Sequence, residues 1–218
     1  AFDGRVRLFP LPSLVLLPDT FVPLNIFEER YLAMVKDALP DGGLIATALL
    51  KPGYEADYNE SPAIYPMVCL GKILRPRLKP NGHIELFLYG LARARIVEEI
   101  PSSPYRQAQV EVVEDIVPPG NDETVAERLH RANAMIPGRQ YMFWGLRRTA
   151  EQLRGVDARP GRYADAMASA SGLGAPQLYE VLEETDVLRR FDLLINHLAL
   201  QAAAGAPEAP DVTDPNLN

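Results

Sequence analysis

Three histidines are the first side chains to consider for catalysis or metal binding. His83, His130 and His197 lie far apart in the chain, without the close spacing of ligand pairs in zinc sites. Neighbouring carboxylates occur as Glu98-Glu99 and Glu183-Glu184. Adjacent side chains point in different directions along a strand or a helix, so a solvated face accounts for these pairs. The sequence therefore predicts no metal site and no cofactor.

A nucleotide-hydrolysing site would need a glycine-rich loop that ends in Lys and then Ser or Thr. Gly71-Lys72 is followed by Ile73, and Pro66 stands five positions before Gly71, so this stretch cannot form such a loop. No serine lies in a Gly-x-Ser-x-Gly elbow, and the chain contains only four lysines. We therefore predict no ATPase or protease site, and no enzyme activity.

Charged residues at the start of a helix are the best candidates for a binding site. Glu28, Glu29, Arg30 and Tyr31 follow a proline-rich segment, where side chains can be displayed without interrupting a sheet. The apolar pattern turns Tyr31 toward the core and the three charged residues toward solvent. Acidic residues at a helix N-terminus also complement the helix dipole, so stabilisation of the helix explains them equally well. An ordered Glu28–Arg30 pair would serve either role.

Arg93 and Arg95 form a second candidate site. Side chains alternate along a strand, so these two residues share one side of it. They are interpreted either as a solvated or salt-bridged face or as a strip that contacts peptide or nucleic acid.

Composition limits the class of protein. A net charge of −7 and a pI near 5.1 disfavour a broad nucleic-acid-binding surface, which would carry an excess of basic residues. Cys69 is the only cysteine, so no intrachain disulfide can form, and its apolar surroundings predict an inert buried thiol. The N-terminus shows no signal pattern, and no apolar run is long enough to span a bilayer. We therefore expect a folded cytoplasmic protein that does not associate with membranes.

The elements that position these residues change character along the chain. Prolines at positions 12, 18 and 23 exclude a long helix or a central strand there, and favour kinked, extended segments. Tyr31, Met34, Val35, Ala38 and Leu39 have the spacing of one helix face, which ends at Pro40. The expected strands are Arg5–Phe9, Leu44–Leu50, Met67–Lys79, His83–Val97 and Gln107–Asp115.

Glycines indicate how the strands turn. Asn81-Gly82 predicts a hairpin with a type I′ turn, because both residues tolerate a positive φ. Gly71 and Gly90 lie inside predicted strands, where glycine weakens pairing, so they indicate bulges or sharp corners of a barrel.

The second half is predicted to be helical. After Val117 a Pro-Pro-Gly linker begins, and no convincing strand follows. The expected helices are Asp122–Ile136, Tyr141–Leu153, Gly161–Ala170, Gln177–Glu184 and a last helix capped by Thr185, with an apolar stripe of Val187, Leu188, Phe191, Leu194, Ile195 and Leu198. Residues 205–218 are rich in Pro and Asp, which predicts a disordered tail. The predicted domains are therefore 1–117 and 118–204.

Three stretches together resemble the N-terminal substrate-binding domain of Lon-type proteases. The first is LFPLPSLVLLPDTFVPLNIFEERY, with matches at Leu8, Phe9, Pro10, Leu11, Pro18, Pro23, Leu24, Ile26, Phe27, Glu28, Arg30 and Tyr31. The second is CLGKILRPRLKPNGHIELFLYGLARARIVEE, with matches at Gly71, Asn81, Gly82, Gly90, Leu91, Arg93, Ala94, Arg95 and Ile96. The third is LYEVLEETDVLRRFDLLINHL, with matches at Leu182, Glu183, Asp186 and Arg189 or Arg190.

The resemblance implies an α+β fold: an N-terminal PUA-like pseudo-β-barrel of about six strands with one inserted helix, followed by a C-terminal helical bundle. It also implies a free-standing, non-catalytic module that binds unfolded or tagged polypeptides, as an adaptor or regulator for a protease or chaperone. The candidate substrate-binding residues are Glu28, Glu29, Arg30, Tyr31, Arg93 and Arg95. The alternative is a PUA-like binder of small molecules or RNA, although the acidic pI counts against nucleic acid.

Overall fold

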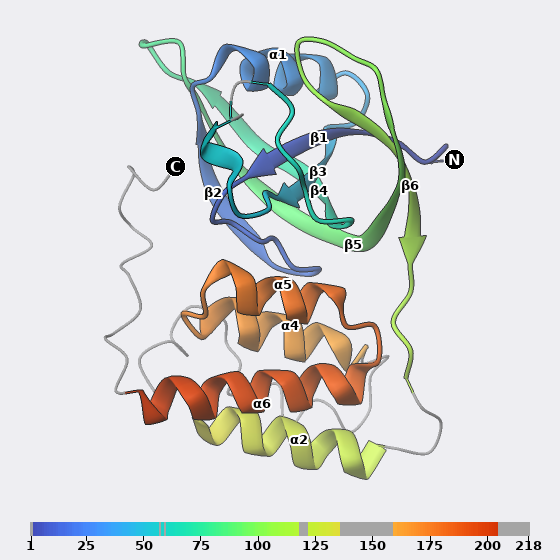
Figure 1. The fold of residues 1–218 in the computed structure, drawn as a ribbon, viewed down its shortest axis with the longest axis vertical. Coiled ribbons are helices and arrows are strands. Elements are labelled where there is room, and N and C mark those ends of the chain that lie inside the picture. The colour runs from blue at the N-terminus through green and yellow to red at the C-terminus, as the bar shows by residue number, and fades with distance from the viewer. Residues whose placement is uncertain (1, 57, 59, 118–121, 136–158, 205–218) are drawn as a thin grey trace. The chain divides into compact units, whose positions relative to one another are not determined.

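The computed structural model describes residues 2–56, 58, 60–117, 122–135 and 159–204 (Figure 1). The chain divides into two compact units, a β unit that ends at Glu114 and a helical unit that begins at Asp115. The fold is α+β, as predicted. Among the described residues, no helix combines the length and the apolar character needed to cross a bilayer.

The described residues of the β unit form six strands and one α-helix. In chain order they are β1 (Arg5–Leu11), β2 (Phe21–Ile26), α1 (Glu29–Ala38), β3 (Leu44–Leu49), the short 3₁₀ helix η1 (Tyr54–Ala56), β4 (Met67–Leu78), β5 (Ile84–Ile100) and β6 (Gln107–Val113). The sheet order is β2-β5-β4-β3-β1-β6, and β5 also pairs with β6. Five strands therefore form a closed ring, and β2 extends the sheet from β5. All the pairings are antiparallel except that of β1 with β3.

The long strand β5 closes the ring by changing partners along its length. On one edge its first half pairs with β2 and its second half pairs with β6, while β4 pairs with β5 from Ile84 to Arg95. A bulge at Leu91 separates the two halves, since Gly71 pairs with Gly90 while Leu70 pairs with Ala92. A Cβ atom on Gly90 would lie 2.1 Å from the Leu17 carbonyl oxygen, so the backbone can approach only a glycine. The predicted bulge is confirmed.

The hairpin between β4 and β5 lies where the sequence predicts it, but the predicted type I′ turn is wrong. The Gly82 N–H donates to the Lys79 carbonyl over 3.0 Å, so Pro80 and Asn81 occupy the two central positions. Gly82 follows them with a φ of +84°. Proline has a fixed negative φ and suits the first central position, which shifts the turn by one residue relative to an Asn-Gly type I′ turn.

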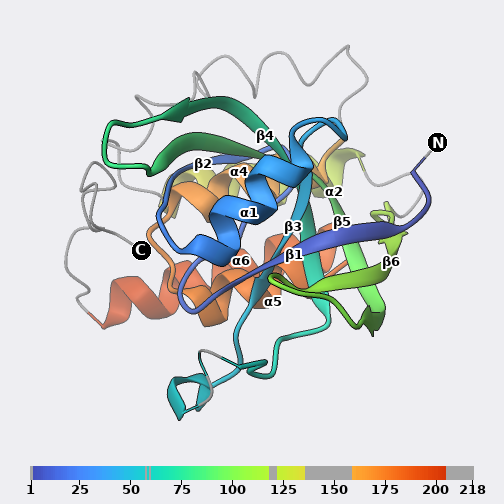
Figure 2. The same ribbon diagram turned by 90° about the horizontal axis from the view of Figure 1, so that it is seen from above.

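Small side chains fill the interior of the ring. The buried cluster consists of Val6, Leu8, Ala46, Ala48, Val68, Leu70, Ala94, Ala108 and Val110. Four of these are alanines, as a narrow barrel requires. Helix α1 lies across one end of the sheet (Figures 1 and 2), and its buried residues Tyr31, Met34, Val35 and Ala38 are those that the helical spacing predicts. Leu39 is exposed because the helix ends there.

Cys69 and Pro23 also occupy the places that the sequence indicates. Cys69 is buried within β4, in agreement with the prediction of a structural thiol. Pro23 lies in β2, which pairs only with β5 among the described strands. A proline is tolerated at such an edge because it has no N–H to donate to a further strand.

The helical unit contains four described helices, α2 (Asp122–Met135), α4 (Gly161–Ala170), α5 (Ala175–Glu183) and α6 (Val187–Ala203). Helix α6 contacts the other three helices. The predicted N-cap is wrong by one residue. Asp186, not Thr185, accepts bonds from the N–H groups of Leu188 and Arg189. The predicted helix 141–153 and the predicted tail 205–218 lie outside the described residues.

The stripe of α6 is mostly apolar, as the helical spacing indicates, but it also includes a charge. Val187, Phe191, Leu194, Ile195 and Leu198 are buried, whereas Leu188 is half-buried. Arg190 is fully buried beside them, which the sequence analysis did not predict.

Candidate functional site

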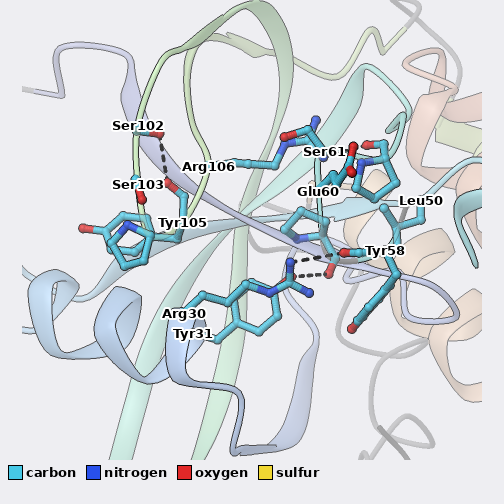
Figure 3. Close-up of a pocket in the computed structure, with 13 residues that line it drawn as sticks. Arg30, Tyr31, Leu50, Tyr58, Glu60, Ser61, Ser102, Ser103, Tyr105 and Arg106 are labelled. Atoms are coloured by element: carbon cyan, nitrogen blue, oxygen red, sulfur yellow. Dashed lines mark hydrogen bonds between the residues drawn. The ribbon is translucent and has the colours of Figure 1, made fainter. Parts of the chain in front are cut away.

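A pocket of about 250 Å³ lies in the β unit at the start of α1 (Figure 3). Segments that are far apart in the sequence form it: the end of β1, the start of α1, the segment after β3 and the β5–β6 connection. Its lining residues are Pro10, Arg30, Tyr31, Leu50, Tyr58, Glu60, Ser61, Pro62, Ser102, Ser103, Pro104, Tyr105 and Arg106. Tyrosine, proline and serine side chains therefore form most of its wall.

Arg30 is the charged centre of one wall. Its Nε and one terminal nitrogen contact Glu28 Oε2 at 3.0 and 2.8 Å, and another terminal nitrogen donates to the Tyr58 carbonyl oxygen over 3.2 Å. The guanidinium carbon lies 4.7 Å from the centre of the Tyr31 ring and 5.0 Å from that of Tyr58. Ion pairing and cation–π contacts thus hold Arg30 in one orientation at the rim of the pocket.

Two tyrosines fix this wall to the fold. The Tyr58 hydroxyl donates to Glu28 Oε1 over 2.8 Å, and the Tyr31 hydroxyl donates to the Pro10 carbonyl oxygen over 3.4 Å. The Tyr31 ring packs edge-on against Phe9 at 4.7 Å. Burial raises the pKa of Tyr31 above its ordinary value. Burial is also the larger cause of the raised pKa of Tyr58, and the hydrogen bond to Glu28 raises it further. Both hydroxyls therefore stay protonated at neutral pH.

The β5–β6 connection forms the opposite wall. Arg106 contacts both carboxylate oxygens of Glu99 at 2.8 and 2.6 Å and donates to the Pro62 carbonyl oxygen over 2.7 Å. Ser102 donates to the Tyr105 carbonyl oxygen over 2.9 Å, and the Tyr105 hydroxyl donates to Asp37 over 2.7 Å. Figure 3 shows Ser102 and Tyr105 on the side of the pocket away from Tyr58.

The pocket keeps hydrogen-bonding capacity after these contacts. Arg30 and Arg106 each make three N···O contacts with described residues, whereas a guanidinium has five N–H donors. The hydroxyls of Ser61 and Ser103 also line the wall. An open hollow adjoins the pocket, lined by Glu28, Glu29, Arg30 and Pro104. Together they form a polar groove that can bind amide, carbonyl and carboxylate groups.

Comparison with known proteins assigns the family. The family model described as "ATP-dependent protease La (LON) substrate-binding domain" matches residues 5–199. The chain belongs to this family. Lon protease from Dictyoglomus thermophilum is 29% identical over 195 residues, which cover 88% of this chain and 24% of the protease. Lon protease 2 from Myxococcus xanthus is 27% identical, over 88% of this chain and 23% of the protease. The chain thus spans about a quarter of the length of these relatives.

Solved structures of Lon N-terminal domains share the fold. The N-terminal domain of Mycobacterium avium complex Lon protease gives a TM-score of 0.67 at 18% identity, over 89% of this chain and 98% of that domain. The Lon N-terminal domain protein from Xanthomonas campestris gives a TM-score of 0.57 at 24% identity, over 93% of this chain and 99% of that protein. Both matches extend over nearly all of the solved chains, so the similarity is that of a whole domain.

The structure brings one predicted group of Lon-domain residues together at the groove. Glu28, Arg30 and Tyr31 form a contact network, and Glu29 is exposed beside it. The expectation that Glu28 and Arg30 face solvent is only partly right. Both are half-buried, because Tyr58 covers them.

Arg93 and Arg95 do not join the groove, and they do not form an exposed strip. Arg93 is only 2% exposed, whereas Arg95 is exposed. Strand β5 is central at this point, with β4 on one side and β6 on the other. The alternation of side chains places both residues on one face but does not reveal that part of this face is covered. Arg93 is therefore not part of a solvated face, and a role of the two arginines in binding stays a prediction.

The opposite wall, and Tyr58 and Ser61 beside it, were not found from the sequence. Tyr58, Ser61, Tyr105 and Arg106 lie in irregular segments without periodicity, and they approach Arg30 only through the closure of the sheet. The only available signal was the composition of these loops, which combine tyrosine with proline and serine. No described group of three or more His, Cys, Asp and Glu side chains is placed to hold a metal ion.

Proposed function

We propose that the polar groove at the start of α1 binds segments of unfolded or tagged polypeptides. The pocket supports this proposal by its chemistry. Guanidinium and hydroxyl donors face the space from walls of tyrosine and proline. Such groups can bind the main chain and carboxylates of an extended peptide without requiring one sequence.

The size of the pocket favours a polypeptide over a small-molecule ligand. Its volume of about 250 Å³ is below the range of roughly 300–1,000 Å³ that is usual for ligand and cofactor sites. One side chain with its adjoining backbone fits this space, and the open hollow lined by Glu29 and Arg30 gives the rest of the peptide a way out. The small-molecule or RNA alternative has no comparable support.

The finer description of the role and the architecture is part of the proposal. We infer that the protein is not an enzyme and that it presents polypeptides to a protease or chaperone as an adaptor or regulator. We also infer that the curled sheet is a PUA-like barrel and that the helices form a separate bundle. The closure of β5 onto β6 and the contacts of α6 with three helices support this architecture.

Substitutions at the groove test the proposal. Binding of fluorescently labelled casein, an unfolded polypeptide, would be measured by anisotropy for the wild type, for Glu29→Ala/Arg30→Ala and for Ser61→Trp, which fills the pocket. We expect each variant to lose about tenfold in affinity, as for residues at the centre of an interface. The melting temperature should stay nearly unchanged, because the altered side chains are exposed or half-buried.

The matched control is Lys36→Ala, an exposed residue on the same helix that does not line the groove. Its affinity should equal that of the wild type. Full casein binding by a well-folded Ser61→Trp variant would show that the groove is not the binding surface.

A further inference from the structure

The main-chain acceptors of the groove are already engaged by the protein itself. Four residues that line the pocket each have a carbonyl group that accepts a hydrogen bond from a side chain of the groove: Pro10, Tyr58, Pro62 and Tyr105. The donors of these bonds are the side chains of Arg30, Tyr31, Ser102 and Arg106. A ligand in the pocket therefore meets carbonyl groups that already have a partner.

Hydrogen-bond donors, in contrast, remain available in the pocket. Arg30 and Arg106 each keep N–H groups beyond their contacts with described residues, and the hydroxyls of Ser61 and Ser103 add to them. The groove therefore matches a chain that presents carbonyl oxygens but few N–H groups.

Proline meets this requirement. It has a main-chain carbonyl group but no N–H. An ordinary extended segment brings one N–H for each residue, and an N–H that enters the groove without finding an acceptor loses the hydrogen bond that it made with water. A proline-rich segment gives its carbonyl oxygens to the arginine and serine donors without leaving such groups unpaired.

The lining of the pocket also suits the conformation of a proline-rich segment. Such chains adopt the extended polyproline II helix, which has no internal hydrogen bonds and leaves its carbonyl groups free. Grooves lined by aromatic side chains bind this helix, and because it forms before binding, little conformational entropy is lost. The tyrosines and prolines of the pocket are Tyr31, Tyr58, Tyr105, Pro10, Pro62 and Pro104.

The charges at the rim favour a basic residue beside the prolines. The two arginines of the groove are each paired with a carboxylate. Glu60 of the pocket and Glu29 of the adjoining hollow are exposed, and within the described part of the chain neither forms an ion pair. These two carboxylates attract a cation and repel an acidic segment.

We propose that the groove selects proline-rich polypeptide segments in the polyproline II conformation that carry Lys or Arg next to the prolines. The proline carbonyl groups accept hydrogen bonds from Arg30 and Arg106, and the basic side chain pairs with Glu29 or Glu60. The inference rests on the proposed polypeptide-binding function of the same groove, and it names the class of segment that the groove prefers.

Three labelled peptides of equal length test this selection by fluorescence anisotropy. The first repeats Pro-Pro-Ala and has Lys at each end, the second replaces every proline with Ser, which restores the N–H groups, and the third keeps the prolines but has Glu at each end. We expect the first peptide to bind at least about tenfold more tightly than the second and about threefold more tightly than the third. Added salt should reduce the difference between the first and the third.

Variants of the protein locate the selection. Ser61→Trp fills the pocket and should weaken binding of the first peptide about tenfold without lowering the melting temperature, because Ser61 is exposed. Ser103→Trp fills the same pocket and takes its place if Ser61→Trp proves unstable.

The preference for a basic residue has its own variant and control. Glu29→Gln/Glu60→Gln should abolish the difference between the peptides that end in Lys and in Glu. Glu55→Gln/Glu111→Gln is the matched control, since it removes two exposed carboxylates of the β unit that do not line the groove. This control should keep the difference.

The outcomes separate this inference from the proposed function. If Ser61→Trp loses casein binding, but the proline and serine peptides bind the wild type equally well, only the selection of proline is refuted. Equal binding of the peptides that end in Lys and in Glu refutes the role of Glu29 and Glu60. If the first peptide keeps full affinity for a well-folded Ser61→Trp variant, the groove does not make the selection. If neither casein nor any peptide binds the wild type, both proposals fail.

Discussion

Arg30 in the β unit and Arg190 in the helical unit have similar partners but different surroundings. Each donates to a backbone carbonyl group and contacts carboxylates: Arg30 uses Tyr58 and Glu28, and Arg190 uses Glu184, Asp115 and Asp165. The Arg190 side chain is 0% exposed, whereas that of Arg30 is 22% exposed.

The difference separates a structural cluster from a site that can bind. Arg190 makes four hydrogen bonds within the helical unit, and a Cβ atom on Gly161 would collide with Asp115 and Arg190, so no ligand can reach the buried guanidinium. Arg30 stands at the rim of a pocket with part of its donor capacity unused. A charged cluster is thus a candidate binding site only if solvent can reach it. The kinds of hydrogen-bond partner, which Arg30 and Arg190 share, do not distinguish the two cases.

The largest effect that we expect is from Arg190→Met. Removal of the guanidinium breaks its buried ion pair with Asp165, and breaking such a pair costs about 3–5 kcal/mol. Urea denaturation followed by far-UV circular dichroism should show earlier unfolding of the helical unit.

Arg189→Met provides the matched control, because Arg189 is exposed on the same helix and should lose less than about 0.5 kcal/mol. Equal free energies of unfolding for Arg190→Met and Arg189→Met would show that the buried arginine does not stabilise the helical unit more than an exposed one.

A smaller loss of stability is expected from Arg30→Met. The pair with Glu28 is partly solvated, and the bond between Tyr58 and Glu28 remains when Arg30 is removed. Such pairs contribute up to about 1 kcal/mol, so the urea midpoint should shift much less than for Arg190→Met. Casein affinity should nevertheless fall, as for the groove variants. A destabilisation as large as that of Arg190→Met would make Arg30 a structural residue.

The sequence predicted the features that depend on local periodicity. The spacing of Tyr31, Met34, Val35 and Ala38 gave the buried face of α1, and it placed Glu28–Arg30 at the helix start. The glycines at positions 71 and 90 indicated the bulge. These features depend on steric preferences of neighbouring residues, which a single sequence contains.

Features that depend on distant segments could not be predicted. Arg190 looked like a polar position beside an apolar stripe, because its partner Asp115 lies 75 residues away in the sequence. The second wall of the groove, with Tyr105 and Arg106, approaches α1 only when the sheet closes. The burial of Arg93 has the same origin. Tertiary proximity of irregular segments leaves no periodic signal in the chain.

The smallest effect that we expect concerns the Tyr58 hydroxyl, which belongs to the accessible cluster. It donates to Glu28 in a part-buried bond, and Tyr58→Phe should lower the free energy of unfolding by only about 0.5 kcal/mol at neutral pH. Burial and the bond to Glu28 raise the pKa of Tyr58 in the folded state above its ordinary value.

A raised folded-state pKa means that ionisation favours the unfolded chain once the pH passes the unfolded value of about 10. The stabilisation by Tyr58 is therefore complete below that pH and is lost as the pH rises through the folded-state pKa. Urea unfolding of the wild type and of Tyr58→Phe, measured at neutral pH and at intervals above pH 10, should show a difference that narrows with rising pH. A constant difference across this range would mean that the Tyr58 hydroxyl does not titrate differently in the folded and unfolded states. The bond to Glu28 would then contribute little to the order of the groove.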